Sequence, residues 1–218
     1  RVAASWGANI LGMDLSLAVN SAKEMTADYH DHVQIIRGDL LRVPIREEAF
    51  DLVYSIGVLD HTPDPRQAFL NLAKCVKPGG RMAVWVYQVQ SPKVEKIMKL
   101  HRSIASLLPV RWIERLSRWS VPIGGVKRKL MNSRIWIIQK LGLAVHALTI
   151  GVSMHPDPEV RACDTLDWYA PEFVSHHTPE EVEGWFREAG FSKVFDPTLD
   201  RPFFYEGQGQ GVHRVGIK

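Results

Sequence analysis

Acidic residues end two short apolar runs near the start of the chain. Asp14 closes residues 9–14, and Asp39 closes residues 33–39. In an open α/β sheet, an acid at the carboxyl end of a strand lies beside the ligand crevice, where its carboxylate can accept ribose hydroxyl protons. The structural alternatives are an acid at a helix N-terminus for Asp14 and a turn-forming aspartate for Asp39.

Candidates for proton transfer follow a third apolar run, residues 50–55. Asp60 and His61 stand just beyond it, and either could act as a general base. His176 and His177 precede a later helix start and could approach the same opening. A loop or helix-start contact is the alternative for His61, and surface or capping roles are the alternatives for the other two histidines.

Helices and strands alternate in the pattern of the sequence up to residue 87. Residues 9–14, 33–39, 50–55 and 81–87 have the apolar runs of strands, and residues 17–29 and 65–76 have helical spacing. The second helix is closed by the stop signal at residues 77–80. This alternation predicts parallel βαβ units in an open, doubly wound sheet, the Rossmann-like α/β class.

The pattern changes after residue 87. Residues 93–154 are predicted to be mainly helical, with interruptions at Pro109, Pro122 and residues 124–125. Thr178 and Pro179, followed by two acids, then predict a new helix that ends at Gly190. Residues 191–195 and 212–217 have the pattern of two final strands.

Two segments carry a resemblance to a known family. Residues 50–65 (FDLVYSIGVLDHTPDP) and 72–80 (LAKCVKPGG) resemble the middle of class I S-adenosylmethionine-dependent methyltransferases, particularly the group related to ubiquinone and menaquinone methyltransferases. Upstream, residues 12–16 and 38–40 stand at the family's spacing. The resemblance covers residues 1–87 closely and 169–218 more loosely, and it implies a mostly parallel sheet with an antiparallel last strand.

The resemblance also implies S-adenosyl-L-methionine as cofactor and assigns residue roles. Asp14, with Leu15, would bind the ribose; Asp39 would bind the adenine amino group, with Leu40 as a backbone contact. Ser55, Ile56 and Gly57 would pass the methionine moiety. Asp60 stands where relatives often carry histidine. The family's glycine-rich loop would precede Arg1, so we expect the chain to be truncated at its N-terminus.

Composition indicates an ordinary globular protein with an uneven charge distribution. Of its 218 residues 45% are hydrophobic, and the two cysteines have no metal-ligand or disulfide spacing. No metal site is expected, and the cytoplasm suits the chain best. Residues 93–140 contain twelve Lys and Arg but two acids, so this segment is strongly basic whereas the remainder is acidic.

Three units follow from these patterns: a cofactor-binding core (1–90), a helical lid or insertion (91–175) and a C-terminal helix with strands that complete the core (176–218). The basic, tryptophan-containing insertion suits a small or lipid-like acceptor, and possible peripheral membrane contact through residues 93–140. A solvated lid is the plainer alternative. No nucleic-acid partner is expected because no recognised binding motif accompanies the charge. The oligomeric state is not predicted.

The function predicted is methyl transfer to oxygen or carbon of a small or amphipathic acceptor. A cofactor-binding relative without catalysis and a NAD-type oxidoreductase are the alternatives. The alternating glycines of residues 207–211 lack the strand-to-helix context of a phosphate loop and are expected to form a flexible connection. Residues 135–154 are apolar, but Gln139, Lys140 and His146 argue against a membrane span.

Overall fold

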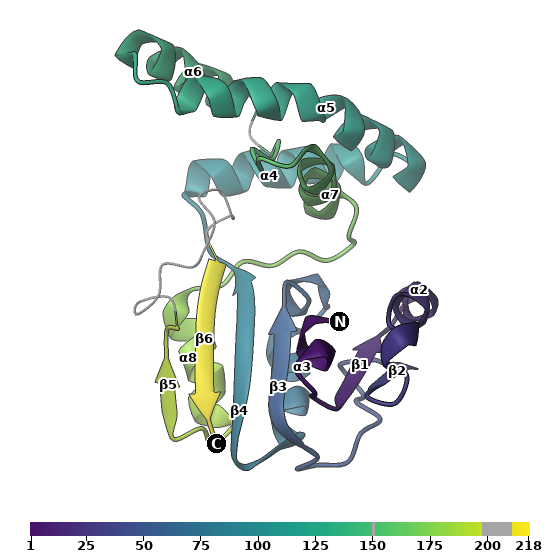
Figure 1. Ribbon diagram of the computed structural model, residues 1–218. Helices are drawn as coiled ribbons and strands as arrows, with labels where there is room; N and C mark the ends of the chain where they lie inside the picture. The colour runs from purple at the N-terminus through teal and green to yellow at the C-terminus, as the bar shows by residue number, and fades with distance from the viewer. Residues whose placement is uncertain (150, 198–210) are drawn as a thin grey trace.

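The strands of the chain form two sheets (Figure 1). The computed structural model describes residues 1–149, 151–197 and 211–218. β1 (Ile10–Asp14) and β2 (Val33–Arg37) make a parallel pair. The larger sheet has the order β3-β4-β6-β5, with bounds Phe50–Ile56 for β3, Val76–Tyr87 for β4, Gly211–Ile217 for β6 and Lys193–Phe195 for β5. β3 and β4 are parallel and β6 is antiparallel to both neighbours, so the last strand is antiparallel as predicted. The mostly parallel sheet that was expected is instead divided into a parallel pair and a mixed four-stranded sheet.

Six short helices of the described residues accompany the strands, and the two that cover the larger sheet have side-chain caps at their N-termini. Asp64 accepts the Gln67 N–H at 2.9 Å before α3, and Thr178 accepts the Glu181 N–H at 3.2 Å before α8. Each cap precedes a proline in the first turn, where the missing N–H costs nothing. The helices are α1 (Val2–Ser5), α2 (Ala18–Met25), η1 (Ala27–Tyr29), η2 (Leu59–His61), α3 (Pro65–Lys74) and α8 (Pro179–Glu188).

The core lies between one face of the larger sheet and helices α3 and α8. Met82, Val84 and Val86 alternate along β4 and are buried on this face, as the period-two geometry of a strand requires. The Phe69 and Phe186 rings meet edge to face at 4.8 Å between the two helices. Trp85 and Tyr87 therefore point to the opposite face of β4. The strand itself begins at Val76, five residues before the predicted start, because Val76 already pairs with Phe50 of β3; the register then shifts before Arg81 pairs with Leu52.

The smaller sheet is joined to this core by the segment that follows β2. Leu40, Leu41, Val43 and Ile45 pack against the core cluster. The Asn71 side chain of α3 donates to the carbonyl oxygens of Leu40 and Leu41 at 3.0 Å each. These contacts fix the loop that carries Asp39 on the core.

Four longer helices form a layer beyond the carboxyl ends of β3 and β4 (Figure 1). We call them the helical unit: α4 (Pro92–Ala105), α5 (Val110–Met131), α6 (Trp136–Leu148) and α7 (Pro158–Tyr169). α7 was not predicted as a separate helix. The predicted break at Pro122 and residues 124–125 is wrong, because α5 runs through both.

Packing against α7 explains why α5 continues. A Cβ added at Gly124 would lie 2.1 Å from the Ser153 carbonyl oxygen, so only glycine permits this approach. Arg161 of α7 donates to the Val121 carbonyl oxygen at 2.7 Å, beside the proline. These tertiary contacts offset the helix-breaking tendency of Pro122.

The chain leaves the core and returns to it at one place. His177 N–H donates to the Tyr87 carbonyl oxygen at 2.8 Å, and Val89 N–H donates to the His177 carbonyl oxygen at 3.1 Å. Gln88 and His177 thus form a parallel bridge between the outgoing and returning segments. Gly211, the last of the alternating glycines, begins β6; the other residues of that predicted connection lie outside the described residues.

Candidate functional site

The two predicted cofactor-binding acids lie at one edge of the smaller sheet. Asp14 ends β1, and the Gly38 N–H donates to its carbonyl oxygen at 3.0 Å, which brings Asp39 to the same edge. Asp14 Oδ1 accepts from the Ser16 N–H and hydroxyl at 2.7 Å, and Asp39 Oδ1 accepts from the Leu41 N–H at 2.8 Å. Both carboxylates therefore organise the local turn. Leu15 is exposed beside Asp14, and Leu40 packs on the core.

The end of β3 supplies the third predicted cofactor segment. Ser55 is buried, and its hydroxyl has no hydrogen-bond partner among the described residues. Ile56 is exposed. Gly57 has a φ of +62°, and a Cβ there would lie 3.1 Å from the Trp85 ring. Because the conformation and the available space both favour glycine, this position keeps the backbone open at the strand end.

The carboxyl ends of the parallel strands in the two sheets face the same side of the molecule. Figure 1 shows the arrowheads of β1, β2, β3 and β4 directed toward the side on which the helical unit lies. The predicted cofactor residues thus stand at the carboxyl ends of their strands, although β1 and β3 belong to different sheets. In α/β proteins this edge is where ligands bind.

A surface hollow of about 350 Å³ lies elsewhere, under the loop after Asp39. Its lining includes Val43, Glu47 and Cys75, and none of the predicted cofactor residues. Since it offers neither the strand-end acids nor the histidines, we do not place the site there.

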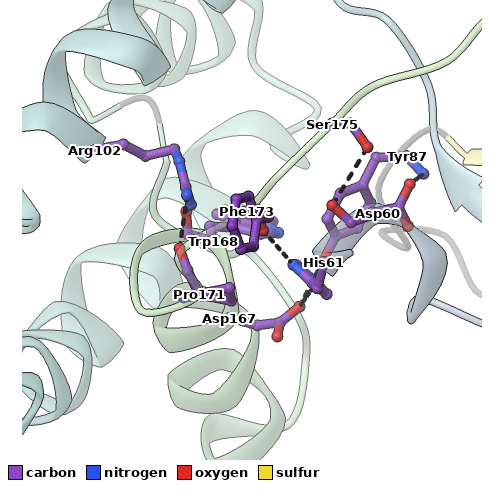
Figure 2. A network of polar contacts seen from close by, with 9 residues as sticks. All are labelled: Asp60, His61, Tyr87, Arg102, Asp167, Trp168, Pro171, Phe173 and Ser175. Atoms are coloured by element: carbon purple, nitrogen blue, oxygen red, sulfur yellow. Dashed lines mark hydrogen bonds and ion pairs between the residues drawn. The ribbon is translucent and has the colours of Figure 1, made fainter. Parts of the chain in front are cut away.

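A polar cluster connects the larger sheet to the helical unit (Figure 2). We call Asp60, His61, Tyr87 and Asp167 the junction cluster. Asp60 and His61 lie in η2 after β3, Tyr87 ends β4, and Asp167 projects from α7. The Tyr87 hydroxyl donates to Asp167 Oδ2 at 2.5 Å, and His61 Nε2 lies 3.5 Å from the same oxygen.

The surroundings of His61 define its proton positions. Nδ1 lies 3.1 Å from the Phe173 carbonyl oxygen, which can only accept, so Nδ1 carries a proton. Nε2 is buried and has no hydrogen-bond partner among the described residues, because 3.5 Å to Asp167 is an ion-pair distance. Burial opposes the charged ring, but Asp167 and the Phe173 carbonyl favour it, and the net result is a raised pKa of His61.

Burial and the contacts from neighbouring side chains act in opposite directions on Asp167. Burial favours the neutral acid, whereas the contacts from His61 and Tyr87 stabilise the carboxylate, and the pKa of Asp167 is lowered overall. Burial, together with that carboxylate, raises the pKa of Tyr87. Tyr87 therefore donates a hydrogen bond to Asp167, and Asp167 carries a negative charge at neutral pH.

Asp60 has a different environment from the one expected. It is fully buried; Oδ1 accepts the Tyr87 N–H at 3.0 Å and its carbonyl oxygen accepts the Ser175 N–H at 3.0 Å. Oδ2 has no hydrogen-bond partner among the described residues. Burial raises the pKa of Asp60 to about 6. With its side chain buried, Asp60 holds the Tyr87 backbone and the returning segment in position.

The two later histidines lie on either side of this junction. His177 is buried, with its ring edge to face with Trp185 at 4.8 Å and Nε2 2.9 Å from the Ser175 hydroxyl. His176 lies nearer the cluster, with its ring 5.9 Å from Tyr87 and Nδ1 3.4 Å from Glu95. His177 is thus a core residue, and His176 borders the cluster.

The sequence reasoning missed Tyr87, Asp167 and Arg102. Tyr87 ends an expected strand, so the rule applied to Asp14 would also have found it. Asp167 comes from α7, whose position no local pattern could reveal. Arg102 donates to the carbonyl oxygens of Trp168 and Pro171 at 2.8 and 2.7 Å, and so anchors the turn after α7 (Figure 2).

Comparison with known proteins supports the resemblance. Residues 1–84 match the family model of a methyltransferase domain. The chain is 29% identical over 108 residues to a sterol 24-C-methyltransferase of Saccharomyces cerevisiae, covering 48% of this chain and 28% of that protein. It is 31% identical over 101 residues to a rice protein named for tocopherol O-methylation, covering 44% of this chain and 28% of the relative.

A solved structure shows the same fold over the whole chain. This Nostoc punctiforme protein, whose name proposes an O-methyltransferase, aligns with a TM-score of 0.51 and 17% identity, covering 100% of this chain and 47% of that one. The predicted Rossmann-like α/β fold is thereby confirmed. The chain spans about a quarter of the length of the curated relatives it matches. Residues 1–84 of the chain are thus similar to a methyltransferase domain family, and the part of the chain that follows them lies outside this match.

Proposed function

We propose that this protein transfers a methyl group from S-adenosylmethionine to oxygen or carbon of a small or lipid-like acceptor. The match of residues 1–84 to a methyltransferase domain supports the reaction class. The names of the yeast and rice relatives, a sterol and a tocopherol methyltransferase, support a lipid-like acceptor. Closer kinship with the ubiquinone and menaquinone group belongs to the same proposal.

The residues at the strand ends fit this cofactor. Ser55 has a buried hydroxyl with no hydrogen-bond partner in the part of the chain that the structure describes, and Gly57 leaves the backbone accessible above Trp85. The exposed carboxylate of Asp14 suits ribose hydroxyls, which are hydrogen-bond donors. In this proposal Asp14 and Leu15 hold the ribose, Asp39 and Leu40 hold the adenine, and residues 55–57 hold the methionine part. The bound cofactor supplies an electrophilic methyl group on a sulfonium.

His61 acts as the general base toward the acceptor. The observation that carries this assignment is that Nε2 accepts or donates no hydrogen bond within residues 1–149, 151–197 and 211–218 and lies 3.5 Å from Asp167 Oδ2. In the neutral ring Nδ1–H is held by the Phe173 carbonyl, so Nε2 keeps the free lone pair. A proton taken there produces an imidazolium beside a carboxylate, which lowers the cost of the charge that forms.

Tyr87 and Asp167 position this base. The short contact from the Tyr87 hydroxyl keeps Asp167 Oδ2 close to the ring, and Asp60 fixes the Tyr87 backbone. The His61 side chain is 17% exposed, so the helical unit already removes most water from it. Alignment and exclusion of water contribute most of the acceleration expected for a simple displacement.

The test combines binding with turnover. S-adenosylhomocysteine is expected to raise the melting temperature of the protein, whereas NAD is not, and Asp14→Ala should abolish the shift. Asp31→Asn, an exposed acid outside the strand ends, is the matched control. A shift with NAD alone would identify an oxidoreductase instead.

Turnover is measured with methyl-labelled S-adenosylmethionine against small phenols and an extract of neutral lipids. Product is expected from the lipid extract, and His61→Ala should lower its rate by about 100-fold or more, the usual contribution of a general base. His30→Ala, an exposed histidine, should leave the rate unchanged. Cofactor binding without transfer to any acceptor would show a non-catalytic relative.

A further inference from the structure

The outer side of the helical unit carries an apolar stripe that the fold does not cover. On α5, residues at alternating spacings of four and three are exposed and therefore share one helix face. They are Trp112, Leu116, Trp119, Ile123 and Val126. The stripe lies beside the buried face of α5, which includes Ile113, Ser117 and Gly124 and packs on α7.

α6 extends this stripe. It packs on α5, where Gly142 allows close approach to Leu130 and Met131, and it leaves Trp136, Ile137 and Leu141 exposed. Figure 1 shows α5 and α6 side by side at the end of the molecule farthest from the sheets. We call the exposed apolar residues of α5 and α6 the outer stripe.

Exposed basic residues border the outer stripe. Between residues 110 and 148 the exposed ones are Arg111, Arg115, Arg118, Lys129, Arg134 and Lys140. Lys140 Nζ lies 4.7 Å above the Trp136 ring centroid, and Arg115 lies 5.1 Å above that of Trp112. In the same range Glu114 is the one acid, and Arg118 pairs with it.

From this arrangement we infer that the outer stripe docks on the surface of an anionic lipid bilayer. Tryptophan and leucine on one face, with lysine and arginine beside them, suit the boundary between acyl chains and headgroups. Six exposed cations complement anionic headgroups. The helices would lie along the bilayer, since no helix among the described residues has the length and apolarity to cross one.

Other binding partners fit the outer stripe less well than a bilayer does. A second copy of the chain would set like charges against each other across the same stripe. A nucleic acid would satisfy the cations but leave Leu116, Ile123 and Leu141 without apolar partners. Lys127 does not contribute to this charge, because it is buried and donates to the Thr149 and Val152 carbonyl oxygens at 3.1 and 3.0 Å.

The inference goes beyond the reaction, and its test requires no turnover. The full chain is sedimented with phosphatidylcholine vesicles, with and without phosphatidylserine, over a salt series. Binding is expected with phosphatidylserine and should weaken as salt rises, because screening reduces the attraction between exposed charges. If the chain sediments with neither kind of vesicle, the inference is overturned.

Matched variants identify the surface. The double variant Trp119→Ser/Ile123→Ser should weaken binding by about tenfold or more, since both side chains lose apolar burial. Trp6→Ser, which replaces an 80% exposed tryptophan outside the helical unit, should not change it. Arg115→Gln/Arg118→Gln should cost about fivefold per charge. Arg42→Gln/Arg46→Gln, also exposed, is the charge control.

Two further outcomes would contradict the inference. If light scattering shows a dimer that Trp119→Ser/Ile123→Ser dissociates, and vesicles do not bind, the outer stripe is a contact between copies. If a DNA or RNA duplex binds in place of vesicles, the charge serves nucleic acid. Equal loss of vesicle binding in the Trp6→Ser control would show that the stripe is not the contact.

Discussion

Tyr87 and Asp167 meet across the junction of two parts of the chain, 80 residues apart in sequence, with the hydroxyl 2.5 Å from Oδ2. Tyr87 ends a core strand and Asp167 belongs to the helical unit. The same carboxylate oxygen faces His61. The charge beside the proposed base is therefore delivered by an element outside the core, and the pKa of that base depends on how α7 is seated.

Asp167→Asn tests this dependence. The carboxylate raises the pKa of His61, so its removal should lower that pKa. A base must be neutral to act, so activity rises with pH through its pKa, and the acid limb of the rate profile should move to lower pH in the variant. The measurement is kcat against pH from 5 to 9, with Asp31→Asn as control. An acid limb at unchanged pH would exclude Asp167 as the positioning residue.

Asp60→Asn tests the buried carboxyl group. The native pKa is about 6 against an ordinary value of 3.8, so the folded state binds this proton more tightly than the unfolded state. Stability from this group is present below pH 4 and is lost as pH rises through 6, on the order of 2 kcal/mol. Urea unfolding at pH 4.5 and 7.5 should show this loss in the wild-type protein but not in the variant. An identical pH dependence in both would show that Asp60 titrates normally.

Gly57→Ala should weaken binding of S-adenosylhomocysteine by roughly tenfold or more, because a side chain there strains the backbone and contacts Trp85. Gly79→Ala separates the two effects: its φ is +74°, but nothing lies within 4 Å of the added Cβ. Isothermal titration gives the affinity and thermal melting gives the stability. Comparable loss of affinity in both variants would mean that backbone strain alone is responsible.

Gly124→Ala should destabilise the protein by about 1–3 kcal/mol, because the added Cβ meets the Ser153 carbonyl and Arg161. Gly184→Ala in α8 is the matched helical control, with nothing within 4 Å, and should stabilise by about 0.5–1 kcal/mol. Denaturant midpoints with unchanged slopes provide the comparison. If Gly124→Ala were neutral, the close packing of α5 on α7 would be wrong.

Local patterns located the elements of the core well. Period-two and helical spacing identified β3, β4, α3 and α8 because each buries one face against a common core and so has a regular apolar pattern. β1 and β2, in the smaller sheet, were identified from their short apolar runs. The start of β4 was predicted five residues too late because the proline and two glycines within residues 76–80 have the pattern of a turn, although Val76 before them already pairs with β3. Helix α5 was split because the contacts that sustain it come from Arg161 and Ser153, distant in sequence.

Only part of the candidate site could be predicted from the sequence, because the rest depends on contacts between residues that are distant in the chain. Asp14, Asp39 and His61 follow apolar runs, so their positions at strand ends could be inferred. The burial of Asp60 could not, because Ser175 and Tyr87 enclose it from other elements. Asp167 carried no local signal, and its role near His61 depends entirely on where α7 packs.

The bridge between Gln88 and His177 means that the whole stretch between them begins and ends at neighbouring points on the core. A segment attached in this way has little influence on how the core strands are connected. If it were removed, a short turn could join the two ends that it leaves. Exchange of this segment for another of different length would leave the strand order intact. The proposed membrane contact can thus be altered or removed as a separate module, without redesign of the sheet.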